Sequence, residues 1–353
     1  MRYKILPIVF IAILVFSCKK KKAGEPDAPQ TLHHGILVLN EGLFQQNNAS
    51  MGWFSFSDNS YTGNFFEQKT NRSLGDTGND MKKYGGKIYV IVNVSSTIEV
   101  LDASTGNSIT QISMVANGTP KQPRYVAFYG PKAFITCYDG YVDVLDTLSL
   151  NITNRIPVGA NPEGLAISNG KLFVANSGGL NSPNVDSTVS VIDLGNLQEI
   201  TRITVGKNPG SVQTDLNGDV YVISRGDYAS VPSRMHRIDA ITNTLVQSFP
   251  FDASGISPFN SNFLISYHDF SSGSNQIALF DPNTETIIDP QYIPTSGIQT
   301  LYGVQYSDMT NRIYCLDAKN YTVTGQVHVF SPNGVFETSY NVGLNPASIL
   351  IYE

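Results

Sequence analysis

The sequence predicts an all-β fold, a seven-bladed β-propeller whose ring is closed by the C-terminal strand pairing with the N-terminal strands. Three observations predict it: an apolar strand ending in a polar turn recurs seven times, a Gly-x-x-Pro corner recurs between the copies, and no stretch shows a helical period of 3.6. Four short strands in each repeat of about 45 residues are typical of a propeller blade.

The recurring apolar strand ends in Asp or Ser. Its copies are Val100-Leu101-Asp102, Val144-Leu145-Asp146, Val191-Ile192-Asp193, Arg237-Ile238-Asp239, Leu279-Phe280-Asp281 and Val329-Phe330-Ser331, with a weaker first copy at Trp53-Phe54-Ser55-Phe56-Ser57. The corner recurs nearly unchanged at residues 158–162, 205–209 and 342–346. Because Asp readily bonds its own backbone in a turn, we interpret the repeated Asp as a turn residue and not as a catalytic carboxylate.

The fourth repeat shows the four strands of a blade, A to D, at residues 163–168, 171–176, 188–193 and 199–205. The chain ends on an isolated A-type strand, 347–352, and the propeller begins on a B-type strand, 35–40. Pairing these two supplies the innermost strand of the first blade and removes two exposed sheet edges. The propeller is therefore predicted to span residues 35–353.

The N-terminus is predicted to be a lipoprotein signal peptide, residues 1–17. Arg2 and Lys4 precede an apolar run that is shorter than the roughly 20 residues needed to cross a bilayer. Leu14-Val15-Phe16-Ser17-Cys18 resembles the bacterial lipobox, in which the cysteine is lipidated. Residues 18–34 are then the lipidated cysteine and a flexible tether. An ordinary signal peptide with a chance cysteine is the alternative.

The composition argues against several classes of function. A formal net charge of -6 disfavours binding of nucleic acid, which needs a basic patch. We find no GxSxG, HExxH, phosphate-binding glycine loop or EF-hand pattern, and the five histidines do not cluster. We therefore expect no enzyme activity, no metal and no cofactor. Cys137 and Cys315 fall in B strands of blades three and seven, and are expected to be buried free thiols.

The predicted strand order assigns two faces to the ring. Loops joining B to C and D to the next A emerge on one face and are long and irregular, whereas the A–B and C–D turns on the other face are short. Long loops on a rigid scaffold are where binding sites lie, so we expect a ligand on the first face, near the central channel.

Candidate ligand-binding residues lie where A strands begin and B strands end. The A starts supply Asp80, Arg124, Tyr125, Glu163 and Tyr302, and the B ends supply Asn40, Asn93, Tyr138, Asn176, Arg225, Tyr267 and Asp317. The alternative for each is structural, since aromatic rings can pack between blades and amides can cap loops. We expect roughly half of them to touch a ligand.

Several motifs together resemble those of the YncE-like propeller lipoproteins of Bacteroidetes. They are Leu39-Asn-Glu-Gly42, residues 74–80, Pro123-Arg-Tyr125, residues 136–141, Asn161-Pro-Glu-Gly164, residues 174–179 and residues 222–227. They are similar above all to the BtuG group of surface lipoproteins. That resemblance implies capture of cobalamin or another corrinoid and its transfer to a TonB-dependent outer-membrane transporter.

The same resemblance implies an outer-membrane location in which the lipid anchor makes the only membrane contact. Surface-exported lipoproteins of this phylum usually carry acidic residues after the cysteine, whereas this chain has lysine at positions 19–22. The cell surface is thus expected, with the periplasmic side as the alternative. For function, a glycan-binding or protein-docking propeller of the cell envelope stays open, because the same broad mouth fits either.

Overall fold

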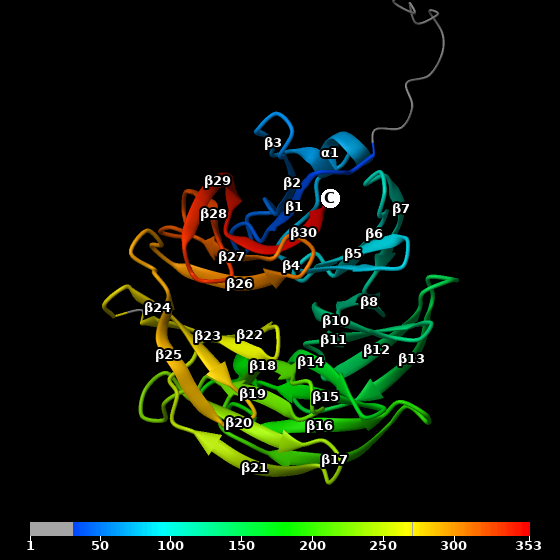
Figure 1. Cartoon of the computed structure of the whole chain (residues 1–353). Helices are drawn as coiled ribbons and strands as arrows, with labels where there is room; N and C mark the ends of the chain where they lie inside the picture. The colour runs from blue at the N-terminus through cyan, green and yellow to red at the C-terminus, as the bar shows by residue number, and fades with distance from the viewer. Residues whose placement is uncertain (1–30, 270) are drawn as a thin grey trace, which may run out of the picture. The chain divides into compact units, whose positions relative to one another are not determined.

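The strands of the chain pair in the order that the repeat predicts. In the computed structural model, which describes residues 31–269 and 271–353, seven four-stranded antiparallel sheets follow one another around a common centre (Figure 1). The prediction of a seven-bladed propeller is confirmed. The predicted signal peptide, Cys18 and the tether as far as residue 30 lie outside the described residues.

Every blade has four strands, from the innermost strand A to the outermost strand D. Blade one is β30 (Pro346–Tyr352), β1 (Gly35–Asn40), β2 (Ser50–Ser55) and β3 (Ser60–Thr62). Blade two is β4 (Gly78–Tyr84), β5 (Lys87–Val92), β6 (Thr97–Asp102) and β7 (Ser108–Ser113). Blade three is β10 (Pro123–Tyr129), β11 (Lys132–Cys137), β12 (Tyr141–Asp146) and β13 (Ile152–Pro157).

The remaining blades repeat the pattern. Blade four is β14 (Pro162–Ser168), β15 (Lys171–Asn176), β16 (Thr188–Asp193) and β17 (Gln198–Thr204), each within one residue of its predicted bounds. Blade five is β18 (Pro209–Thr214), β19 (Val220–Ser224), β20 (Arg234–Asp239) and β21 (Thr244–Phe249). Blade six is β22 (Gly255–Phe259), β23 (Asn262–Asp269), β24 (Ser274–Asp281) and β25 (Thr286–Ile293). Blade seven is β26 (Leu301–Ser307), β27 (Arg312–Asp317), β28 (Thr324–Phe330) and β29 (Phe336–Leu344).

The two ends of the propeller meet in blade one. β30 pairs antiparallel with β1, with Gly35 opposite Tyr352 and Ile36 opposite Ile351. Figure 1 shows the red C-terminal strand beside the blue β1. The C-terminal strand thus supplies the innermost strand of the first blade, as predicted.

The hydrophobic core lies between blades. Because side chains alternate along a strand, each blade packs one face on the preceding blade and the other face on the next. Leu37 and Leu39 of β1 lie in a cluster with blade two, whereas Ile36 and Val38 lie in a cluster with blade seven. Five further clusters fill the remaining interfaces between neighbouring blades. Closing the ring therefore completes the core.

A short helix, α1 (Phe65–Thr70), and a 3-10 turn, η1 (Gly179–Asn181), correct the expectation of an all-strand repeat. Phe65 and Phe66 of α1 are buried against the interface of blades one and two. One apolar pair at the start of a helix of this length leaves no periodic pattern, so sequence periodicity could not reveal it. A small hairpin, β8 (Val115–Ala116) with β9 (Thr119–Pro120), similarly interrupts the loop before β10.

The Asp that ends the C strand in blades two to six acts in the turn, as predicted. Asp102 Oδ1 accepts from the backbone N–H groups of Ser104 (3.0 Å) and Thr105 (2.9 Å). Asp193 Oδ1 accepts in the same way from Gly195 (2.8 Å) and Asn196 (3.0 Å). These carboxylates satisfy backbone donors in the C–D turns and are not available for catalysis.

A buried polar side chain stands three residues before the Asp or Ser that ends the C-strand repeat in most blades. Glu99, Asp143, Ser190, His236 and His328 share this place, and all are buried. Asp143 Oδ2 accepts from Lys121 Nζ (2.5 Å), and Asp143 Oδ1 accepts from Arg155 Nε (2.7 Å). Lys121 comes from the D–A loop that leads to β10, so the buried ion pair fixes that loop to the middle of blade three.

His236 predicts a pH dependence of stability. Burial, and then the charge of Arg234, lower the pKa of His236 to about 4. In the unfolded chain this histidine has its ordinary pKa of about 6.5. Above that pH it is neutral in both the folded and the unfolded state, so it does not lower the free energy of unfolding. The free energy of unfolding should fall by up to about 3 kcal/mol as the pH drops toward 4. Urea unfolding of wild type and His236→Gln at pH 7 and pH 4.5 checks this. An equal loss in both proteins would contradict it.

Candidate functional site

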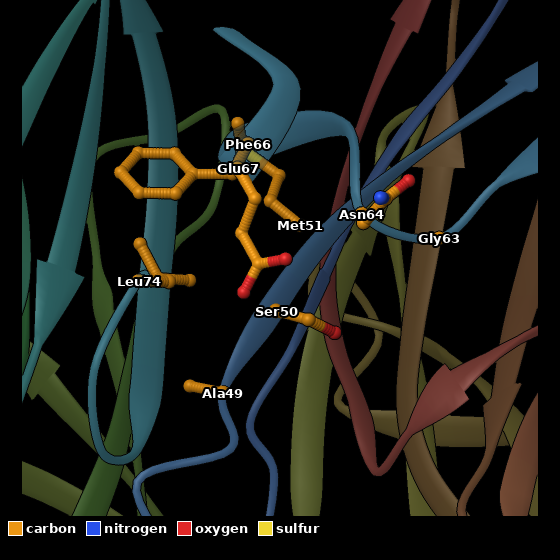
Figure 2. Close-up of a pocket in the computed structure, with 8 residues that line it drawn as sticks. All are labelled: Ala49, Ser50, Met51, Gly63, Asn64, Phe66, Glu67 and Leu74. Carbon is orange, nitrogen blue, oxygen red and sulfur yellow. The ribbon is translucent and has the colours of Figure 1, made fainter. Parts of the chain in front are cut away.

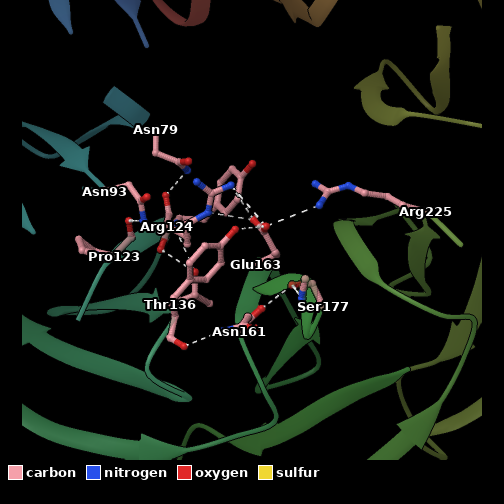
Figure 3. Close-up of polar contacts among 12 residues, drawn as sticks. Asn79, Asn93, Pro123, Arg124, Thr136, Asn161, Glu163, Ser177 and Arg225 are labelled. Carbon is pink, nitrogen blue, oxygen red and sulfur yellow. Dashed lines mark hydrogen bonds and ion pairs between the residues drawn. The ribbon is translucent and has the colours of Figure 1, made fainter. Parts of the chain in front are cut away.

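One end of the innermost strands gathers charged and aromatic side chains from several blades. A strands begin and B strands end at this face, as the pairing of Pro162 with Asn176 and of Leu301 with Asp317 shows. Figure 3 shows Arg124 of β10, Glu163 of β14 and Arg225 after β19 converging there. We call the group formed by Arg124, Tyr125, Tyr138, Glu163 and Arg225 the central cluster.

Glu163 is the centre of this cluster. Its carboxylate accepts from Arg124 Nη2 (3.0 Å) and Nε (3.1 Å) and from the hydroxyl of Tyr138 (2.5 Å). Arg225 Nη1 lies 3.5 Å from Glu163 Oε1. Burial would raise the pKa of this carboxyl, but the two guanidinium groups outweigh burial and lower the pKa. Glu163 is thus a buried anion held between two cations.

Aromatic rings enclose Arg124. Its Cζ lies 4.8 Å from the centre of the Tyr138 ring and 5.6 Å from that of Tyr125. Asn79 donates to the backbone oxygen of Arg124, which fixes the start of β10. Burial raises the pKa of the Tyr125 and Tyr138 hydroxyls, so both remain neutral donors. The cluster therefore offers cationic, hydroxyl and flat aromatic groups together.

A second pair, which the sequence analysis missed, lies on the blade-one and blade-seven side. The hydroxyl of Tyr302 donates to Glu41 Oε2, and the Tyr302 and Tyr321 rings are 6.0 Å apart. Burial raises the pKa of Glu41, while Tyr302 and Arg124 act to lower it. Glu41 directly follows Asn40, so extending the candidate positions one residue past the B end would have found it.

Five predicted site residues are used within the scaffold instead. Asn176 is fully buried and donates to the hydroxyls of Thr188 and Ser190 (both 2.9 Å). Asn93 donates to the Pro123 oxygen. The remaining three are also buried: Asn40 donates to Ser50 and Tyr61, Asp80 accepts from Met81 and Val126, and Asp317 accepts from Gln299, Thr300 and Lys319. These contacts hold loops and neighbouring blades in place.

Tyr267 is not brought to the central cluster either. It lies in β23 of blade six, half-buried against the hydrophobic cluster shared by blades five and six. Burial, with Asp252 nearby, raises the pKa of Tyr267 to about 12. Of the twelve predicted positions, Arg124, Tyr125, Tyr138, Glu163 and Arg225 come together, and Tyr302 joins Glu41.

Place at the strand end separates most of the B-end residues. Asn40, Asn176 and Asp317 are the last residues of their strands and bond within the scaffold. Tyr138 and Arg225 lie one residue past the strand end, at the place that Glu41 takes in blade one, and contact Glu163 of blade four from blades three and five. Asn93 shares that place but is short, and it bonds Pro123 instead.

Two hollows lie away from this cluster. One, of about 70 Å³, lies beneath α1 between Phe66, Leu74 and Ser50, and Figure 2 shows the Glu67 carboxylate reaching into it. The other is a groove of about 570 Å³ on the opposite face, between blades one and seven. Its walls include the Phe54 and Tyr340 rings, 4.0 Å apart, and Arg312.

The described residues contain no group of three or more His, Cys, Asp and Glu placed to hold a metal ion. Cys137 and Cys315 are buried free thiols in β11 and β27, in the blades where the repeat placed them. None of the helices within residues 31–269 and 271–353 has the length and apolar character for a membrane crossing.

Comparison with known proteins adds a family and a set of structural likenesses. A family model described as "Domain of unknown function (DUF5074)" matches residues 34–345. No curated protein sequence matches the chain.

Among solved structures, a quinonprotein alcohol dehydrogenase-like protein from Bacteroides thetaiotaomicron is similar with a TM-score of 0.66 and 14% identity, over 91% of this chain and 79% of that one. Hydrazine synthase of Kuenenia stuttgartiensis is similar with a TM-score of 0.60 and 14% identity, over 74% of this chain and 85% of that one. The structure of dihydro-heme d1 dehydrogenase is similar with a TM-score of 0.56 and 11% identity, over 92% of this chain and 77% of that one. At such identity these likenesses show the fold alone.

Proposed function

The chain belongs to the DUF5074 family, and from this premise we propose that it is a non-catalytic binding protein that takes a corrinoid such as cobalamin at the central cluster. The observation that carries the proposal is the convergence on Glu163 of Arg124, Tyr138 and Arg225 from two neighbouring blades. The hydrophobic core of the propeller lies between blades and does not include these long polar side chains.

The chemistry of the face supports a corrinoid. Such a ligand is broad and flat, is fringed with amides and, in cobalamin, carries a phosphate. Tyr125, Tyr138 and Tyr302 are all partly exposed at this face and offer ring surface. The hydroxyls of Tyr138 and Tyr302 donate to Glu163 and Glu41 and can still accept a hydrogen bond from a ligand. Arg225 offers a charged fork for an oxygen-rich group. The amides of such a ligand both donate and accept hydrogen bonds. Glu41 and Glu163 supply acceptor oxygens for the amide N–H groups, and the arginines supply donors for the amide oxygens.

Exposed apolar loop tips on the same face support transfer to a protein partner, for which we propose a TonB-dependent outer-membrane transporter. Phe44, Leu180 and Tyr228, from the B–C loops of blades one, four and five, are 67%, 65% and 75% exposed. Large apolar side chains at loop tips around a binding site suit docking of a protein. This arrangement also favours protein docking over glycan binding as the second candidate function.

The cellular setting completes the proposal. We propose that Cys18 is lipidated and anchors the protein to the outer membrane, at the cell surface. Mass spectrometry of the mature N-terminus tests the lipid, and protease accessibility on intact cells separates the cell surface from the periplasmic side.

Titration of the soluble chain, residues 31–353, with cyanocobalamin tests the ligand. We expect saturable binding without turnover. Tyr302→Ala should weaken binding by about 1–3 kcal/mol, because an exposed ring at the site is lost while no deeply buried charge is left alone. Asn217→Ala, an exposed turn residue on the opposite face, is the matched control and should leave binding unchanged. Absence of cyanocobalamin binding by the folded wild type would rule out the corrinoid, and a glycan array would then test the sugar alternative.

A further inference from the structure

Arg225 carries unused hydrogen-bonding capacity. Its side chain is 30% exposed and has one ion-pair partner among the described residues, Glu163 at 3.5 Å. No described residue accepts a hydrogen bond from the Arg225 guanidinium, although that group has five N–H donors. Its backbone is fixed, since the N–H of Arg225 donates to the Asn208 oxygen (2.9 Å). The Arg225 guanidinium thus faces the site from a fixed backbone (Figure 3), and most of its donors have no partner among the described residues.

Glu163 does not neutralise Arg225. Two nitrogens of Arg124 and the hydroxyl of Tyr138 already bond the Glu163 carboxylate at 2.5–3.1 Å. Arg124 also interacts with Glu41, so two carboxylates share the charge of Arg124, whereas Arg225 has Glu163 alone as an ion-pair partner among the described residues. A group of opposite charge at Arg225 would therefore gain both charge complementarity and hydrogen bonds.

A glycine seats the guanidinium. A Cβ on Gly210 of β18 would lie 2.6 Å from Arg225 Cζ, 2.7 Å from Nη2 and 2.8 Å from Nε. The side chain of Arg225 thus lies directly against the backbone of the neighbouring innermost strand. A methyl group there would meet the flexible end of Arg225 and push it away, while leaving the strands in place. Gly210 is a positioning residue for this arginine.

We propose that Arg225, seated on Gly210, forms an oxyanion subsite that binds a phosphodiester of the ligand. The planar fork of arginine matches the paired oxygens of a phosphate, and one charged hydrogen-bond pair suffices to orient a large ligand. The phosphodiester is a group of the proposed corrinoid ligand, so the subsite rests on the proposed function.

Two probes test the subsite: cyanocobalamin, whose nucleotide is joined through a phosphodiester, and dicyanocobinamide, which lacks the phosphate together with the ribose and the base. Arg225→Ala should weaken cyanocobalamin binding about 10- to 100-fold and change dicyanocobinamide binding less than about threefold. Gly210→Ala should act in the same direction with a smaller effect, and Arg225→Lys should fall between wild type and Arg225→Ala. Arg202→Ala, which removes a surface arginine of β17 paired with Glu199, is the matched control.

Thermal unfolding of each variant confirms that it is folded before binding is interpreted. Equal weakening of both probes by Arg225→Ala, or no weakening of either, would overturn the phosphate subsite while leaving corrinoid binding intact. If wild type binds neither probe, the proposed function fails. The subsite is then tested alone with pyrophosphate: saturable binding that Arg225→Ala abolishes would support it, and no binding would overturn it.

Discussion

Deleting residues 347–353 is expected to unfold the whole propeller. β30 holds β1 by backbone pairing and contributes buried Ile349 and Tyr352 to the interfaces with blades seven and two. Burial of each such side chain contributes about 1.5–3 kcal/mol, and the strand contributes several of them. The sum is comparable to the 5–15 kcal/mol that stabilises a typical domain.

Circular dichroism during heating measures the effect of the deletion. The truncated chain should lack the cooperative transition of the wild type and be digested rapidly by a protease. Removal of the exposed Glu353 alone is the control and should leave the melting temperature unchanged. A truncated protein that melts like the full chain would show that the closure of blade one is not needed for the fold.

Asp143→Ala should cost about 3–5 kcal/mol of unfolding free energy. Asp143 is fully buried and pairs with Lys121, so the substitution leaves an ammonium group buried without its partner. Asp139→Ala is the matched control, because Asp139 pairs with the same Arg155 at the surface and should contribute less than about 1 kcal/mol.

Urea unfolding at pH 7 gives both values. The double variant Lys121→Met, Asp143→Leu should recover much of the loss, since apolar side chains of similar size replace the buried pair. A similar small loss in Asp143→Ala and Asp139→Ala would contradict the role of the buried ion pair in fixing the loop before β10.

The sequence predicts the blades because the repeat encodes them locally. In blades two to six the turn after the C strand is set by an Asp that bonds its nearest backbone neighbours, so the role of this Asp follows from position alone. The ion pair between Lys121 and Asp143 could not be predicted from the sequence. It joins the D–A loop before β10 to the C strand of the same blade, and the number of residues between these two elements differs from blade to blade. The burial of α1 depends on the neighbouring blade in the same way.

The candidate site was predicted in part for a related reason. Position at an A start or B end places a residue on the correct face, but the exact place at the strand end decides whether it meets its counterparts. Asn176 is the last residue of β15 and bonds Ser190 of its own blade, whereas Arg225 lies one residue past the end of β19 and extends to Glu163. Glu41 takes the same place one residue past β1, where the sequence analysis chose Asn40 instead.

The location of the ligand is the central claim, and hydrogen exchange of the backbone with and without cyanocobalamin tests it most directly. Bound ligand should slow exchange in the segments that contain Tyr125, Tyr138 and Arg225, all at one face of the ring. Exchange in the turns at 169–170 and 217–218, on the opposite face, should stay unchanged. Slowed exchange confined to the opposite face, where Phe54 and Tyr340 line the groove between blades one and seven, would contradict the account.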